Sequence, residues 1–416
     1  MKKAAIPLLL AALLALPALV RAQDRKSIIP LSHLRMNDTL VVSSADTIQQ
    51  KDLYDVIRGI FNKHSKTENK AAVIGSKPVI SILPAVGYTL QTKLAATISG
   101  NIAFRMSPES RISTISSNAA YTQRKQILIP IQSNIWTKNN AFNYIGDIKF
   151  YKYPQSTFGL GSNSSVSNNN PMDYTLIRVA ETVLKKIVGN FYAGAGFIYD
   201  NHYGISEEGN PDGSTSDYAL YGEKSHTVSS GITLNALVDM RNSTITPTSG
   251  FYASLIFRDN KKFLGSTSSW KSLIVDVRKY YRFPENSKNV LALWSYDWVV
   301  LTGRPPYLDL PATTWDQNNG TGRGYIQGRF RGAQMVYLES EYRYGITANG
   351  LLGGVVFVNG QSFSASPGSS LERMQAGYGA GLRIKLNKVS KTNIAVDYGF
   401  GNQGSNGVFV TVGEIF

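Results

Sequence analysis

The sequence of 416 residues contains no cysteine. Disulfide bonds and cysteine metal sites are therefore impossible, and packing or a closed hydrogen-bonded sheet must hold the fold together. Histidine is scarce as well, and its four occurrences lack metal-ligand spacing and are expected in the leader or in loops: His33, His64, His202 and His226. We therefore expect no metal site, no cofactor and no catalytic residue.

Long apolar runs are lacking past residue 22, so no later segment is expected to span a membrane as a helix. The apolar run within residues 1–22 follows Lys2 and Lys3 and ends in small residues. This pattern predicts a secretory signal peptide that is cleaved between Ala22 and Gln23, and the missing cysteine excludes a lipoprotein anchor. An exported chain without spanning helices is periplasmic, secreted or an outer-membrane β-barrel.

Positive charge is in excess, with a formal net charge of +15. Loss of Lys2, Lys3 and Arg21 with the signal peptide would leave 40 basic and 28 acidic residues, a surplus of twelve positive charges. Such a surplus in a cytosolic protein would suggest nucleic acid, but export removes that partner. Contact with outer-membrane lipids or lipopolysaccharide, or a cationic barrel interior, fits better, with scattered solvated charge as the alternative.

From Lys77 to Phe416 the sequence alternates with the period of two that is typical of β-strands. One face carries large apolar residues and the opposite face carries Glu, Arg, Lys or Asp. This pattern predicts an all-β fold, a 16-stranded antiparallel transmembrane β-barrel with lipid outside and water inside. The expected strands are 78–90, 92–105, 111–124, 126–139, 142–153, 172–187, 189–201, 224–241, 249–259, 266–282, 288–301, 333–345, 349–362, 373–388, 391–402 and 406–416.

The alternation assigns a face to individual side chains. In 334–344 it directs Leu338 outward and Glu341 inward. In 290–300 we expect the face that contains Trp294 to contact lipid and Asp297 to face inward. The last strand is expected to continue to the chain end, with its terminal aromatic residue, Phe416, at the membrane interface.

Residues 23–76 do not have the barrel pattern and are interpreted as a short periplasmic leader. Within them, 51–63 places apolar residues on one helical stripe, which predicts an amphipathic helix. This helix is expected either to plug the barrel mouth or to lie on the inner leaflet, and a disordered leader is the alternative.

Three motifs resemble the BamA/TamA-type outer-membrane protein assembly superfamily, the bacterial surface antigen barrels. The first is a strand–turn–strand signature, the second is a long-loop tip, and the third is a penultimate hairpin. Their residues are Asp239, Arg241, Pro247 and Gly250; Arg323, Gly324 and Tyr325; and Gly379, Gly381, Arg383 and Asp397. The resemblance covers 78–416.

The resemblance implies that the sixth extracellular loop folds back into the lumen, where its tip Arg323 pairs with Glu341, near Arg343 of the same strand. A planar guanidinium suits this role because it bonds a carboxylate bidentately and still donates elsewhere. A second acidic position of the family corresponds to Asn359 here, so we expect a network with one negative charge less and a less firmly held loop.

The periplasmic domains of family assembly factors do not fit within 23–76, so the chain resembles a short, barrel-only member. Family members are thought to work through a seam between the first and last strands. Pro84 cannot donate a ladder hydrogen bond, and Gly407 and Gly413 loosen the last strand, which together suggest a weak seam.

Three functions follow as expectations. The first is assistance to membrane-protein insertion or translocation, with unfolded barrel proteins as clients. The second is a passive or lipid-contacting barrel that the loop plugs. The third is a structural subunit of a larger complex with other outer-membrane proteins. The sequence does not determine the oligomeric state.

Overall fold

The computed structural model describes residues 49–61, 77–89, 93–317 and 319–416. The chain divides into two units, Met1–Thr47 and Ile48–Phe416, and all described residues belong to the second. The expected signal peptide 1–22 and the leader up to residue 48 therefore lie outside the described residues. Among the described helices, none has the length and apolar character needed to cross a membrane.

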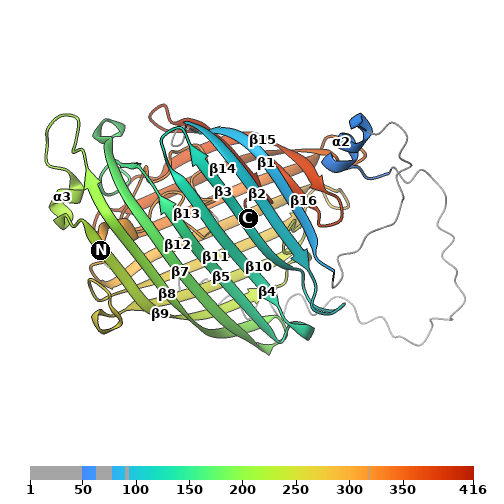
Figure 1. Cartoon of the computed structure of the whole chain (residues 1–416), viewed down its shortest axis with the longest axis horizontal. Coiled ribbons are helices and arrows are strands. Elements are labelled where there is room, and N and C mark those ends of the chain that lie inside the picture. Colours follow the sequence, from blue (N-terminus) through green and yellow to red (C-terminus); the bar gives the residue numbers. More distant parts are fainter. Residues whose placement is uncertain (1–48, 62–76, 90–92, 318) are drawn as a thin grey trace, which may run out of the picture. The chain divides into compact units, whose positions relative to one another are not determined.

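Seventeen antiparallel strands form one sheet (Figure 1), which confirms the predicted all-β antiparallel fold. Each long strand pairs with the next long strand along the chain. The three-residue β6 pairs with the first residues of β7, next to the part of β7 that pairs with β5. Each of the sixteen predicted segments overlaps one long strand, and β7, β8, β10, β12 and β14 extend beyond the predicted ends. The strands are β1 Val79–Thr89, β2 Lys93–Phe104, β3 Ser113–Thr122, β4 Ile127–Trp136, β5 Phe142–Lys152, β6 Gln155–Thr157, β7 Asn170–Val188, β8 Phe191–Glu207, β9 His226–Asp239, β10 Gly250–Asn260, β11 Trp270–Arg282, β12 Val290–Gly303, β13 Gln334–Gly345, β14 Leu352–Ser364, β15 Gln375–Asn387, β16 Thr392–Gly401 and β17 Asn406–Val412.

Short helices lie before the first strand and in the connections between strands. They are the α-helices α2 Leu53–Phe61 and α3 Asp217–Gly222, and the 3-10 helices η2 Lys138–Asn140, η3 Val166–Asn168, η4 Lys262–Leu264 and η5 Tyr307–Asp309.

Helix α2 lies within the predicted 51–63 helix, whose last two residues are outside the described part of the chain. It is bound to the strand turns at one end of the barrel. Asp52 Oδ2 accepts from the Lys388 backbone N–H at 2.9 Å, and Asp55 Oδ2 accepts from Lys388 Nζ at 2.7 Å. The Lys51 N–H donates to Asn349 O at 3.0 Å. The helix therefore caps the β13–β14 and β15–β16 turns.

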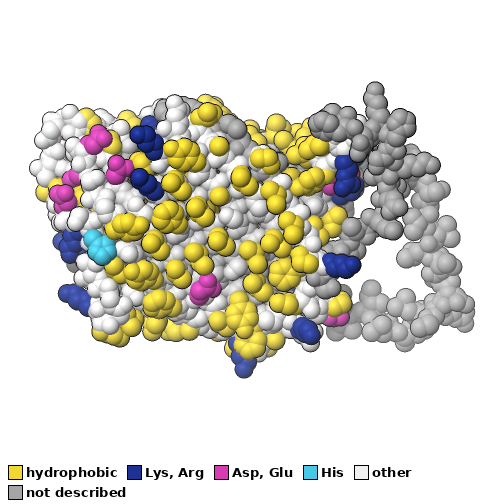
Figure 2. Space-filling view, viewed as in Figure 1, with side chains coloured by type: hydrophobic (Ala, Val, Ile, Leu, Met, Phe, Trp, Pro, Cys, Tyr) yellow, Lys and Arg dark blue, Asp and Glu magenta, His cyan; other side chains and the backbone are white. Residues whose placement is uncertain are grey.

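Apolar side chains dominate the outer surface of the sheet. Figure 2 shows hydrophobic side chains across the middle of the face in view and Lys and Arg mainly near its two ends. Exposed examples come from strands all around the barrel: Ile98, Phe150, Leu234, Leu338, Val358, Tyr378 and Phe400. A band of this kind matches the hydrocarbon layer, so these side chains are suited to contact lipid.

The inner surface carries buried charged groups. Examples from six strands are Lys149, Asp200, Arg258, Asp276, Glu341 and Asp397. On β13 the alternation has the predicted sense, because Glu339, Glu341 and Arg343 face inward while Leu338 is exposed outside.

In strand β12 the face that points into the barrel is the opposite of the predicted one. Trp294 and Trp298 are buried in the lumen, whereas Leu293 is exposed and Asp297 lies on the outer face. The reason is that both faces of this strand carry large apolar residues, Leu291 and Leu293 on one and Trp294 and Trp298 on the other, so periodicity alone does not choose between them. The inward position gives the Trp294 indole N–H an acceptor, Asp276 Oδ1, at 2.9 Å.

Carboxylates also occur on the outer side of the sheet. Glu181 of β7 is exposed, opposite Gly146 of β5, and Asp297 is half-buried with the Ser295 hydroxyl 3.3 Å from its Oδ2. The outer band is thus mainly apolar but carries Glu181 and Asp297, which the predicted all-apolar exterior did not include.

Candidate functional site

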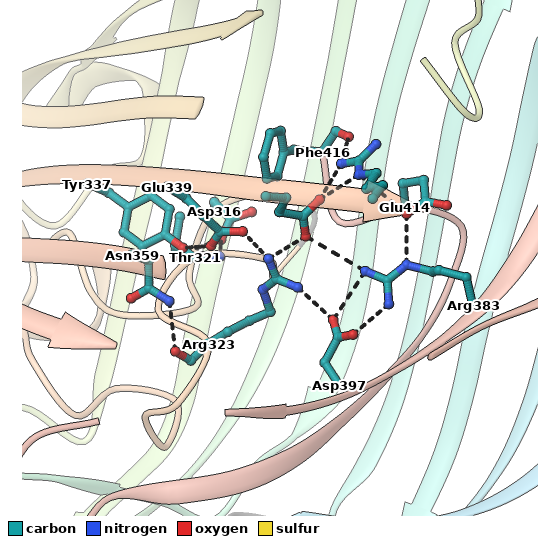
Figure 3. A network of polar contacts seen from close by, with 12 residues as sticks. Asp316, Thr321, Arg323, Tyr337, Glu339, Asn359, Arg383, Asp397, Glu414 and Phe416 are labelled. Atoms are coloured by element: carbon teal, nitrogen blue, oxygen red, sulfur yellow. Dashed lines mark hydrogen bonds and ion pairs between the residues drawn. The ribbon is translucent and has the colours of Figure 1, made fainter. Parts of the chain in front are cut away.

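The candidate site is the tip of the long connection between β12 and β13, which enters the barrel. Figure 3 shows the tip residue Arg323 surrounded by side chains of the inner wall. Arg323 and Tyr325 are almost completely buried. The tip is therefore part of the barrel interior, as the family resemblance implied.

Arg323 binds three carboxylates at once. Its Nη1 donates to Asp397 Oδ2 of β16 at 2.7 Å, and its Nη2 donates to Glu339 and Glu341 of β13. Its Cζ lies 3.7 Å from the centre of the Phe357 ring, which adds a cation–π contact. Only a planar guanidinium can satisfy partners on two strands while stacking on a ring.

The tip backbone is held separately from the Arg323 side chain. Asn359 Nδ2 donates to Arg323 O at 2.9 Å. The Tyr325 hydroxyl donates to Ala376 O and accepts from the Asn402 backbone N–H. The expectation that Asn359 merely weakens the network misses this bond, because an ionised carboxylate at this position could not donate to a carbonyl.

Glycines of β15 and β16 leave space for the backbone of the loop tip. A Cβ at Gly399 would lie 2.7 Å from Gly324 N, and a Cβ at Gly377 would lie 2.8 Å from Arg323 O. Gly324 itself has φ +105°, which favours glycine. The glycine-rich inner faces of the hairpin are therefore the surface on which the loop tip rests.

The hairpin glycines of the family signature have related roles. A Cβ at Gly379 would lie 2.5 Å from the tip of the Phe357 ring, and a Cβ at Gly381 would overlap the Asp397 carboxylate. These two positions thus leave space for the ring and for the acid that bind Arg323.

A second layer of arginines extends the network. Arg383 Nη1 donates to Asp397 Oδ1 at 2.5 Å, and its Nε donates to Glu414 Oε2 at 2.9 Å. Arg343 Nε donates to Glu341 Oε2 at 2.6 Å. Asp397 and Glu341 therefore each bridge the tip arginine and a wall arginine.

The chain end belongs to this network, which corrects the prediction for Phe416. Strand β17 ends at Val412, Gly413 adopts φ +111°, and the tail then turns into the lumen. The Phe416 ring is buried and stacks on Trp294 with centroids 4.9 Å apart, and Phe416 O accepts from Arg343 Nη2 at 3.0 Å. Glu414 and the terminal aromatic are thus held inside by arginines, and Phe416 is not at the lipid interface.

Glu414 is the main residue that sequence reasoning missed. The predicted strand 406–416 runs through Glu414 without a break, so the sequence pattern does not predict that Glu414 leaves the strand and enters the barrel. Gly413 was a usable signal, because a glycine before the last three residues permits the turn that brings Glu414 inward.

The strand–turn–strand signature lies at a separate position, around the β9–β10 turn. Asp239 binds Arg241 through two bonds of 3.0 and 2.9 Å, and its Oδ2 also lies 3.1 Å from Arg111 Nη1. Gly250 begins β10 with φ +111°, and Pro247 is buried in the same turn. This cluster fixes a turn and does not contact Arg323.

Two of the four histidines fall within the described residues. His202 is buried in β8, with its Nδ1 3.6 Å from Asp309 Oδ1, and His226 is the first residue of β9. The expectation of a loop position is therefore wrong for both. No group of three or more potential metal ligands occurs among the described residues.

No family model matches the sequence, and no curated protein is similar to it in sequence. Among solved structures, BamA from Haemophilus ducreyi lacking POTRA domains 1–3 is similar with a TM-score of 0.51 and 13% identity, over 81% of this chain and 70% of that chain. CdiB from Acinetobacter baumannii is similar with a TM-score of 0.51 and 11% identity, over 80% of this chain and 59% of that chain. The chain has a barrel fold similar to theirs.

The expected seam lies between β1 and β17. The two strands are neighbours, but no hydrogen-bonded ladder joins them within the described part of the chain. Pro84 of β1 is paired with Ile98 of β2, and Gly407 of β17 is paired with Gly399 of β16. Gly407 and Gly399 bring the seam strand next to the surface that holds the loop tip.

Proposed function

We propose that this chain is an outer-membrane barrel of the assembly type, which assists insertion or translocation of other proteins through the β1–β17 seam. Its partners are outer-membrane lipids, lipopolysaccharide and unfolded barrel clients. The apolar outer band, the inward loop tip and the barrel similarity to BamA and CdiB support the proposal.

One observation carries the proposal: the loop tip and the last strand share a continuous set of ion pairs. Arg323 binds Asp397, Asp397 binds Arg383, and Arg383 binds Glu414 just beyond β17. A client strand that pairs with β17 would displace the tail and would disturb this set. Movement of the seam and release of the loop are therefore coupled.

The energetics of the network support this coupling between the seam and the loop. Each buried carboxylate is stable only while its arginine partners remain in place, and removal of one partner from a buried pair costs about 3–5 kcal/mol. The network is thus stable as a whole and sensitive to a single broken contact.

The test is folding of an unfolded client barrel into lipid vesicles that contain the purified protein. We expect the wild type to speed client folding relative to empty vesicles. Arg323→Glu should abolish the gain, because it places a fourth carboxylate among three. Arg323→Glu combined with Glu341→Arg should restore part of the gain, because it re-forms one pair with reversed charge.

Asp212→Asn is a matched control, because Asp212 lies in an exposed loop and, among the described residues, its carboxylate accepts hydrogen bonds from Ser214 alone. It should behave as the wild type. Equal client folding with empty vesicles and with wild-type vesicles would rule out the insertion function, and retained activity in Arg323→Glu would rule out a role for the loop tip.

A plugged pore is the second candidate function, favoured by the cavity of about 330 Å³ that remains in the lumen. Solute efflux from the same vesicles separates the two. Efflux that rises in Arg323→Glu without any effect of the wild type on client folding would favour the pore. Co-purification with other outer-membrane proteins would instead favour the third expected role, a structural subunit.

A further inference from the structure

A cavity of about 280 Å³ lies among the connections at the barrel end opposite helix α2. Three segments form it: α3 with the residues that follow it, the β10–β11 turn, and the start of the β12–β13 connection. Figure 1 shows α3 at this end. The β12–β13 connection is the predicted sixth extracellular loop, so this end of the barrel is expected to face outside the cell.

The charged side chains of this cavity are positive. Lys224 and Arg304 line it and are exposed to solvent, whereas no described Asp or Glu lines it. Neither cation forms an ion pair with a carboxylate among the residues that the structure describes. The arginines of the loop-tip network differ, since Arg323 and Arg383 each bind acidic side chains. Two cations without a counter-charge in one cavity favour an anionic ligand.

Neighbouring groups hold Arg304 in one orientation. Its Cζ lies 4.2 Å from the centre of the Tyr221 ring. The Tyr221 hydroxyl donates to Pro305 O at 3.0 Å, which fixes the ring beside the loop. Arg304 O accepts from the Ser268 hydroxyl at 2.7 Å, which ties the loop to the β10–β11 turn. Stacking uses the flat face of the guanidinium and leaves the N–H groups at its edge able to bond phosphate oxygens.

Lys224 is positioned through its backbone. Its N–H donates to the Tyr218 hydroxyl at 3.1 Å, and the same hydroxyl donates to Lys224 O at 2.7 Å. The buried Tyr218 ring packs against the Tyr307 ring, with the centroids 5.3 Å apart. The ammonium group therefore extends from a fixed point of the chain, which lowers the entropy lost when a ligand orders it.

We propose that this cavity binds a phosphate monoester. Its volume is close to the lower limit of small-molecule sites, about 300 Å³, so a compact group fits. A phosphate monoester carries up to two negative charges, which match the two cations better than a carboxylate does. The edge of Arg304 would bond two phosphate oxygens, and Lys224 would neutralise the remaining charge.

Two sources supply this chemistry at the outer surface: a free sugar phosphate, and the phosphorylated headgroup of lipopolysaccharide. The cavity includes no residue of β1 or β17. Phosphate binding is therefore independent of the proposed seam function, and either can fail without the other.

The experiment titrates glucose 1-phosphate into the full-length protein in an amine-oxide detergent, which contains no phosphate. Calorimetry reports binding, and glucose is the uncharged comparison. We expect a saturable signal with glucose 1-phosphate alone. It should weaken by about tenfold in Arg304→Gln and in Lys224→Gln, because each variant loses charge-assisted hydrogen bonds. Arg304→Lys should keep only part of the affinity, because an ammonium lacks the planar fork.

Lys262→Gln is the matched control. Lys262 is exposed in the β10–β11 turn, has the same charge as Lys224 and does not line the cavity. This variant should bind glucose 1-phosphate as the wild type does. Folding of each variant is checked by its electrophoretic shift on heating.

A second titration distinguishes the two sources. Lipopolysaccharide and its dephosphorylated form are each added to the protein in the same detergent, and Arg304→Gln should weaken binding of the phosphorylated form only. Binding of lipopolysaccharide without binding of glucose 1-phosphate would assign the phosphate to the lipid. Binding of both would show that a phosphate monoester is sufficient.

Two results would overturn the proposal. The first is the absence of a saturable signal with both glucose 1-phosphate and phosphorylated lipopolysaccharide. The second is an affinity in Arg304→Gln that equals the affinity in Lys262→Gln, which would show that this cavity does not hold the phosphate.

Discussion

Arg383 Nε lies 2.9 Å from Glu414 Oε2, a contact that ties the inner face of β15 to the tail beyond β17. Arg383 also binds Asp397, the acid that holds the loop-tip arginine. One side chain therefore connects the end of the chain with the inserted loop.

Loss of the Glu414 carboxylate should release the tail. Glu414→Ala removes a buried partner of Arg383, which still keeps Asp397, so we expect a loss of about 1–3 kcal/mol in the free energy of unfolding. Urea titration of the refolded barrel in vesicles measures it. The same loss in the exposed-loop variant Asp212→Asn would show that the effect is not specific to the tail.

Lysine should not replace Arg323. A single ammonium cannot reach Glu339, Glu341 and Asp397 with fixed geometry, so Arg323→Lys should free the loop tip. We expect a protease of broad specificity to cleave 304–333 at least about tenfold faster than in the wild type, since the loop opens more often. Unchanged cleavage would contradict the role assigned to the guanidinium.

A methyl group at Gly399 should displace the loop tip. The Cβ of Gly399→Ala would lie 2.7 Å from the Gly324 backbone nitrogen, so we expect about 1–3 kcal/mol of destabilisation in the same urea titration. Gly100→Ala is the matched control, because nothing lies within 4 Å of its new Cβ. Equal effects of the two substitutions would refute the close approach of the tip.

Docking of α2 should depend on pH. Burial alone would raise the pKa of the Asp55 carboxyl, but the hydrogen bonds from Lys388 and from the Asp52 backbone outweigh it and hold this pKa below its ordinary value of 3.8. A lowered carboxyl pKa stabilises docking above pH 3.8, and this contribution is lost as the pH falls through the lowered value.

A spin label on Gly59→Cys reports the docking, since the chain has no other cysteine and Gly59 is exposed. We expect the label to be restricted at pH 7 and to become mobile as the pH falls through the lowered pKa of Asp55. Asp55→Asn should be mobile throughout. A label that stays restricted in Asp55→Asn would show that this ion pair does not hold the helix.

The strand order was predictable because lipid and water impose opposite requirements on alternate residues. On β13 and β16 one face is charged, as with Glu341 and Asp397, and the other is apolar, so both the strand and its orientation follow from the sequence. On β12 both faces carry large apolar residues. The inward position of Trp294 depends on Asp276 of the neighbouring strand. The alternation within one strand carries no information about a partner on another strand.

The residues of the site were predictable only where they belong to a family motif. The pairing of Arg323 with Glu341 follows from the family resemblance and from the inward face of Glu341. The bond from Asn359 to the loop backbone and the inward tail require the three-dimensional position of the tip and of Gly413. The lipid-facing carboxylate of Glu181 has no explanation in the structure.

Hydrogen exchange of the β17 amides, from Val408 to Val412, tests the central claim most directly. If the loop tip and the last strand are coupled through Asp397, Arg383 and Glu414, then Arg323→Lys should speed exchange in β17 and leave the β7–β8 hairpin unchanged. Exchange in β17 that is the same in Arg323→Lys and in the wild type, with the loop released, would contradict the account.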